Sequence, residues 1–301
     1  MHEEITWGLL IVIYLFTAGL SAGAMVASNG ALLLGGERYE RISRWGAYIA
    51  PFPIAIGTGM LLLDLGSPLN FYQLFLRLQL TSPMSYGSWA ILLFTILSLV
   101  YCYLWLPKNI QVLKVPRNSE LWLRRLAKVM PILSIIVASY TGLLLNAASR
   151  PLWQTPLLPQ LFLVSALSTG VASVILAASL SRRWRANHQE LHVLTVFDAV
   201  LVATELIIFA AMALSARLGP LSQRLAFSEL ISGQFAGMFW VFVVGLGLVL
   251  PLILKLVELK GDVPAKWYNS IVVGSSGLVI FGGFFVRYLI TYAGQLHGWV
   301  R

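Results

Sequence analysis

The sequence has few charged residues and almost none of the side chains that bind redox metals. Only 11% of its 301 residues are charged, whereas soluble domains usually devote about a quarter to charge. One cysteine, Cys102, excludes disulfides and thiolate-bound clusters within the chain. None of the histidines lies clearly inside an apolar run, where a haem would need its ligands; they are His2, His188, His192 and His297. We therefore predict a membrane protein with no metal of its own.

Long apolar runs account for most of the sequence, 58% of which is hydrophobic. A helix needs about 20 apolar residues to cross a hydrocarbon core of about 30 Å. The sequence predicts eight such helices, at 7–33, 45–65, 89–106, 129–145, 161–180, 193–214, 235–254 and 271–292. The expected fold is an all-α integral membrane protein whose connections are too short to contain a soluble domain.

Basic residues alternate between the two sides of this arrangement. Fifteen lie in the odd-numbered connections: Arg38, Arg41, Arg44, Lys108, Lys114, Arg117, Arg124, Arg125, Lys128, Arg182, Arg183, Arg185, Lys255, Lys260 and Lys266. Only Arg77, Arg150, Arg217, Arg224 and Arg301 lie on the other side. Since cytoplasmic loops carry the excess of Lys and Arg, both termini are expected outside, and the net charge of +9 does not indicate nucleic acid. The two longest outer connections, at 66–88 and 215–234, are candidates for segments at the membrane interface.

Three polar side chains are expected together in the outer third of the membrane. Asp64 ends the second predicted helix, Tyr14 lies about two turns into the first, and Tyr140 lies about two turns from the outer end of the fourth. Two phenols and a carboxylate can hold a quinone headgroup and exchange its protons. The alternative for Asp64 is a carboxylate that reaches the interface, and for either tyrosine an ordinary aromatic belt.

Three further ionisable residues lie in the second half. Asp198 and Glu205, seven residues apart, share one face of the sixth helix, and Arg287 lies in the eighth as their only obvious cationic partner. Such residues inside a membrane are costly unless paired, which makes each a functional candidate. Two interpretations remain open, a proton path and a structural network that locks the two helices together.

Four segments resemble the NrfD/PsrC family, the membrane subunits of polysulfide reductase and formate-dependent nitrite reductase complexes. They are IYLFTAGLSAG, LTSPMSYGSW, ASYTGLLLNA and RYLITYAGQL, and the resemblance extends over nearly the whole sequence. It implies two four-helix bundles, at 1–148 and 149–301, with the quinone site in the first; the second contains Asp198, Glu205 and Arg287, the residues of the alternative proton path or structural network. It also implies that Tyr140 contacts quinone, and that Tyr14 and Ile11 replace a quinone-contacting His and an Asn of a polysulfide reductase.

The leading hypothesis is a quinone-reactive anchor subunit of a respiratory oxidoreductase in the cytoplasmic membrane of a bacterium or archaeon. Menaquinone or ubiquinone would exchange electrons with a ferredoxin-like iron–sulfur subunit docked on the outer face. A molybdopterin or multihaem subunit would complete the complex. The rival is a proton-coupled secondary transporter, which predicts helices broken at mid-membrane in both halves.

Overall fold

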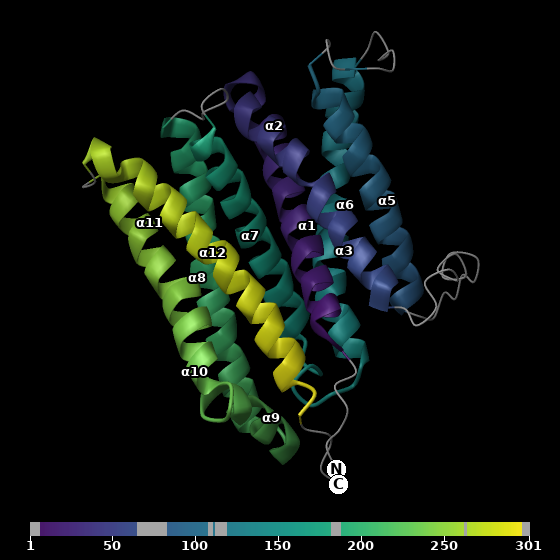
Figure 1. The fold of residues 1–301 in the computed structure, drawn as a ribbon, viewed down its shortest axis with the longest axis vertical. Helices are drawn as coiled ribbons and strands as arrows, with labels where there is room; N and C mark the ends of the chain where they lie inside the picture. The colour runs from purple at the N-terminus through teal and green to yellow at the C-terminus, as the bar shows by residue number, and fades with distance from the viewer. Residues whose placement is uncertain are drawn as a thin grey trace.

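The regular structure of the described residues is helical throughout (Figure 1). A computed structural model of the protein describes residues 7–64, 83–107, 111, 119–181, 188–261 and 264–296. Its helices are α1 (Leu9–Gly35), η1 (Gly36–Tyr39), α2 (Glu40–Ile49), α3 (Pro51–Asp64), α5 (Pro83–Trp105), α6 (Ser119–Ala147), α7 (Leu157–Leu180), α8 (His188–Leu218), α9 (Leu221–Ile231), α10 (Ala236–Met238), η3 (Phe239–Val249), α11 (Leu250–Lys260) and α12 (Ala265–Ala293).

Eight helical segments in the described ranges are long and apolar enough to cross a membrane, which confirms the predicted number. Two of them combine several elements: α2 with α3, and α10 with η3 and α11. Several helices extend beyond the apolar runs. For example, α6 begins at Ser119, ten residues before the predicted start, and its first turns carry Arg124, Arg125 and Lys128. The backbone hydrogen bonds of a helix also form outside the hydrocarbon core of a membrane, so a helix can extend past the end of its apolar run.

The two central helices, α1 and α7, hold the molecule together. α1 packs against α2, α3, α6, α7 and α12, and α7 also packs against α6, α8 and α12. A Cβ at Gly23 of α1 would overlap the Ala166 carbonyl, and a Cβ at Gly170 of α7 would overlap the backbone of Gly23. Small residues at these positions therefore let the two backbones approach closely, as helix association in lipid requires.

The first and last spanning helices meet at one end of the molecule. α1 begins and α12 ends there, beside α9 and α10, in the lower part of Figure 1. The backbone N–H of Trp7 donates to Oε1 of Gln295, and Nε2 of Gln295 donates back to the Trp7 carbonyl, at 2.9 and 3.1 Å. Trp153 packs on Trp7 and donates from Nε1 to the Ile290 carbonyl at 2.7 Å.

We call the end of the molecule where α1 begins and α12 ends the terminal end. The opposite end, which carries Arg38, Arg124 and Lys260, is the basic end.

Two spans depart from regular α-helix. Ala50 separates α2 from α3, and Pro51 and Pro53 follow it without backbone donors. The η3 segment is a π-helix, a form that usually lasts a single turn. Gly247 of η3 lies against α12, where its Cβ would be 2.6 Å from Cα of Gly282. Both spans remain helical across these positions.

The structure describes only one of the two candidate interfacial segments in full. In the later one, α8 continues to Leu218 and α9 forms a separate short helix. Most of the earlier one, at 65–82, lies outside the described residues.

Candidate functional site

Tyr14 and Tyr140 are brought together where α1 packs against α6. Tyr14 is fully buried and Tyr140 is 8% exposed, and the two phenols are close enough to interact electrostatically. Among the described residues, the Tyr14 hydroxyl has no hydrogen-bond partner. An unpaired buried polar group costs about 1–3 kcal/mol. A polar group of a bound molecule could recover that cost.

A cavity of about 420 Å³ lies beside Tyr140, between α5 and α6. Its lining consists of Tyr86, Gly87, Ile135, Ile136, Ser139, Tyr140 and Leu143. The ring of Tyr140 lies directly against Gly87, where a Cβ would overlap it. Tyr86, Ile136 and Leu143 are about half exposed, so the cavity opens towards the surface that hydrocarbon would cover. Ligand pockets typically measure about 300–1,000 Å³ and are mostly apolar with a few polar groups, as this one is.

The sequence pattern predicted no role for the α5 side of this cavity, which Tyr86 and Gly87 form. Both residues are in the LTSPMSYGSW segment that carries part of the family resemblance. The sequence does not show which side chain lies against Gly87. Only the packing of α5 on α6 shows that Gly87 makes room for the Tyr140 ring.

Asp64 lies apart from the two tyrosines. It is the last residue of α3 and is exposed. Gly57 marks where α3 passes Tyr14, because a Cβ there would be 3.4 Å from the Tyr14 carbonyl. Asp64 follows seven residues later, about 10 Å further along the helix at 1.5 Å per residue. The structure therefore places Asp64 nearer the terminal end than Tyr14.

Arg287 is completely buried among α12, α7 and α1. Its Nη1 donates to the Gly283 carbonyl at 2.8 Å and to Oγ of Ser165 at 2.9 Å. Its guanidinium also lies over the rings of Phe16 and Phe162, at 5.8 and 5.5 Å. Glu205, 2% exposed on α8, lies close enough to Arg287 and to Ser165 to interact with both. Ser165 thus lies close to both Glu205 and the Arg287 guanidinium.

The Asp198 carboxylate pairs with a cation that the charge pattern assigned to a loop. Nζ of Lys255 lies 2.9 Å from Oδ2 of Asp198, and the two side chains are 1% and 0% exposed. Oγ of Ser168 donates to Oδ1 of Asp198 at 2.7 Å. The prediction that Lys255 belongs to a cytoplasmic connection was wrong, as was the view of Arg287 as the only obvious cation in this half. Lys255 lies within α11, which turns its side chain inward against α8.

A third polar cluster lies one helical turn nearer the basic end. Oε1 of Glu258 accepts from Oγ1 of Thr195 and from the Tyr268 hydroxyl, both at 3.1 Å. Thr195 is three residues before Asp198, and Glu258 is three residues after Lys255. Because α8 and α11 pack together, buried polar groups follow one another from the basic end towards Glu205.

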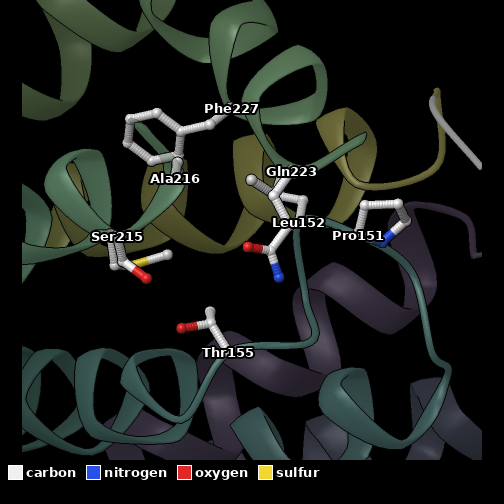
Figure 2. A pocket seen from close by; sticks show the side chains of 8 residues that line it. Pro151, Leu152, Thr155, Ser215, Ala216, Gln223 and Phe227 are labelled. Carbon is white, nitrogen blue, oxygen red and sulfur yellow. The ribbon is translucent and has the colours of Figure 1, made fainter. Parts of the chain in front are cut away.

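A second cavity, at the terminal end, is too small for a quinone headgroup. It measures about 20 Å³, room for about one water molecule. Its lining comes from the α6–α7 connection, α8 and α9: Pro151, Leu152, Thr155, Met212, Ser215, Ala216, Gln223 and Phe227. Figure 2 shows the amide of Gln223 and the hydroxyl of Thr155 on opposite sides of this space. In the described ranges, no three His, Cys, Asp or Glu side chains lie together as a metal site would require.

Comparison with known proteins identifies the family. A family model described as "Polysulphide reductase, NrfD" matches residues 1–297. The sequence is 30% identical to the C subunit of the polysulfide reductase of Wolinella succinogenes, over 98% of this protein and 96% of that one. It is 28% identical to the NrfD homolog of Haemophilus influenzae, over 97% and 95%. It is 24% identical to the Hdr-like menaquinol oxidoreductase integral membrane subunit of Archaeoglobus fulgidus, over 98% and 72%. This multi-pass integral membrane protein therefore belongs to the NrfD family of polysulphide reductase membrane subunits.

Proposed function

We propose that this protein is the quinone-reactive anchor subunit of a multisubunit oxidoreductase. Quinone or quinol would bind where Tyr14 and Tyr140 meet, with its isoprenoid tail in the cavity between α5 and α6. The name of the A. fulgidus relative, a menaquinol oxidoreductase subunit, supports a quinone as the substrate. The W. succinogenes relative is named as one component of a polysulfide reductase, which supports a complex with other subunits.

The observation that carries this proposal is a buried hydroxyl beside an apolar cavity that opens to the membrane. Tyr14 has no hydrogen-bond partner among the described residues, and Tyr140, which is close enough to interact with it, lines the cavity. A quinone carbonyl needs a hydrogen-bond donor, which the tyrosine hydroxyls supply, and the tail needs an apolar channel connected to the hydrocarbon. Asp64, exposed at the end of α3, would exchange the proton with the aqueous side.

The test is Tyr140→Phe in the assembled complex, with quinol-linked activity as the measurement. Loss of a hydrogen bond to a substrate carbonyl is expected to lower activity at least tenfold, since 1.4 kcal/mol corresponds to a factor of ten. Tyr292→Phe is the matched control, because Tyr292 is a half-buried tyrosine of α12 that does not line the cavity. Equal activity of the two variants would show that the Tyr140 hydroxyl is not a donor to quinone.

The arrangement of the complex follows from the same proposal. The first bundle would span 1–148 and the second 149–301, joined by the packing of α1 on α7. With both termini outside, the quinone site would lie near the outer face. A ferredoxin-like iron–sulfur subunit would dock there and connect it to a molybdopterin or multihaem subunit. Antibody access to a terminal tag in intact and permeabilised cells tests the orientation.

We infer a second activity, proton movement through α8, α11 and α12. It is favoured by the series of buried polar groups that runs from Glu258 through Asp198 and Lys255 to Glu205 and Arg287. Glu205→Gln keeps the size and hydrogen-bonding capacity of the side chain but removes its titration. In proteoliposomes it should uncouple proton movement from quinone turnover. Unchanged coupling in a stable complex would leave these residues with only the structural role of locking the helices together.

The transporter alternative is less well supported. It predicts spans that unwind at mid-membrane in corresponding helices of the two halves. The irregular stretches at Pro51 and in η3 remain helical. Purification separates the two functions, because an anchor subunit brings an iron–sulfur protein with it, whereas a transporter purifies alone and moves a substrate.

A further inference from the structure

A groove of about 440 Å³ lies at the basic end, on the opposite side of the membrane from the Tyr140 cavity. It separates the last turns of α1 from the first turns of α8. Ala27, Gly30 and Ala31 line the α1 side, and Phe197 lines the α8 side. Val171 of α7, which is buried, lies at its base. The groove thus lies between the helices of the first and second halves of the protein.

Small side chains on α1 make this groove. A Cβ added at Gly30 would meet no described atom within 4 Å, so the space beside the helix is open. The side chains at its rim face outward: Leu34 is 93% exposed and Phe197 is 45% exposed. In a membrane these surfaces contact hydrocarbon. A narrow apolar groove that is continuous with the lipid phase fits a single hydrocarbon chain.

The membrane-surface end of the groove is cationic. Nη2 of Arg38 donates to Oε1 of Gln189 at 2.6 Å, which links η1 to the first turn of α8. The Arg38 guanidinium lies 5.9 Å from the centre of the Tyr39 ring, and Tyr39 is part of the groove lining. Arg38 is exposed, and a guanidinium carries five N–H donors in a planar fork that matches phosphate oxygens. An anionic group at the end of a hydrocarbon chain therefore meets a complementary charge.

We propose that this groove is a binding site for an anionic phospholipid, with one acyl chain between α1 and α8 and the phosphate on Arg38. Basic residues beside clefts between transmembrane helices are typical of anionic-lipid sites. A quinone fits less well, because its neutral carbonyls would not use the positive charge of Arg38. A soluble phosphate would leave the apolar groove unfilled. The bound lipid would fill the space between the two halves of the molecule.

Two variants, each with a matched control, test the two ends of the site. Gly30→Leu fills the groove where the structure leaves room, and Gly59→Leu is its control, since Gly59 of α3 also has open space and is not in the lining. Arg38→Gln removes the cation, and Arg124→Gln is its control, as another exposed arginine at the basic end. The full-length protein is purified in mild detergent with any subunits that accompany it. Native mass spectrometry then measures binding of phosphatidylglycerol and of phosphatidylcholine with the same acyl chains.

The expected result is one phosphatidylglycerol per protein molecule, bound about tenfold more tightly than phosphatidylcholine, because both lipids carry the phosphate but only choline adds a positive charge that the Arg38 guanidinium repels. Arg38→Gln should abolish this preference, Gly30→Leu should weaken the binding of both lipids about tenfold, and both controls should behave as wild type. Equal binding of the two lipids by wild type overturns the proposal, and so does binding that neither variant changes. Displacement of the lipid by menaquinone in wild type but not in Gly30→Leu would identify a quinone as the occupant and also overturn it.

Discussion

Replacing Lys255 with methionine tests the buried ion pair directly. Methionine has a similar length and no charge, so the substitution leaves the Asp198 carboxylate in the protein interior with Ser168 as its described hydrogen-bond partner. Removing one member of a buried pair costs about 3–5 kcal/mol, because the remaining charge stays desolvated. Lys255→Met should therefore lower the free energy of unfolding by about that amount. Combining it with Asp198→Asn should restore most of the loss, with a coupling energy of about 3 kcal/mol.

The assay is reversible unfolding of the purified protein in mixed micelles, with increasing mole fraction of a denaturing detergent. Lys260→Met is the control, because Lys260 is exposed at the end of the same helix and its substitution should change stability by less than about 0.5 kcal/mol. If Lys255→Met and Lys260→Met have equal effects, or if the double variant is simply additive, Asp198 and Lys255 do not form a charged pair.

Three other substitutions test the packing that positions the candidate site. Gly87→Ala should displace the Tyr140 ring and lower quinol-linked activity at least tenfold, whereas Gly59→Ala, which meets no described atom within 4 Å, should leave it unchanged. Gly23→Val should separate α1 from α7 and reduce the free energy of unfolding by about 1–3 kcal/mol, measured by the same micelle titration. Trp153→Phe removes a hydrogen bond to the end of α12 and should cost about 1 kcal/mol; no change would show that this bond does not stabilise the terminal end.

The sequence predicted the spanning helices well because hydrophobic length is a local property. Each run long enough to cross the hydrocarbon core is a helix in the structure, including the run that contains the π-helix η3. Gly19 and Gly23 are four residues apart on α1, a spacing that favours the close approach of another helix, but only the structure identifies that helix as α7. The helix ends were less accurate, because helix α6 continues through charged residues that the hydropathy pattern assigns to a loop.

The candidate site was predictable only in part. Tyr14 and Tyr140 were expected at similar depth, and the packing of α1 on α6 brings them together. Asp64 was expected at the end of the second predicted helix, and it is the last residue of α3; its exchange of protons with quinone stays a prediction. Gly87 had no predicted role, because a glycine that makes room for a ring on another helix leaves no signal in its own segment.

By itself the sequence determined that the protein has eight helices long and apolar enough to cross a membrane and which polar residues are costly to bury there, since both depend on transfer free energies of local segments. The tertiary structure decided which of those residues meet. Lys255 has the sequence context of a loop lysine at the membrane surface, yet the packing of α11 on α8 turns it towards Asp198, 57 residues away in the sequence (255 − 198 = 57). That pairing depends on the rotation of two helices about their axes, which the contacts of both helices with the rest of the molecule determine.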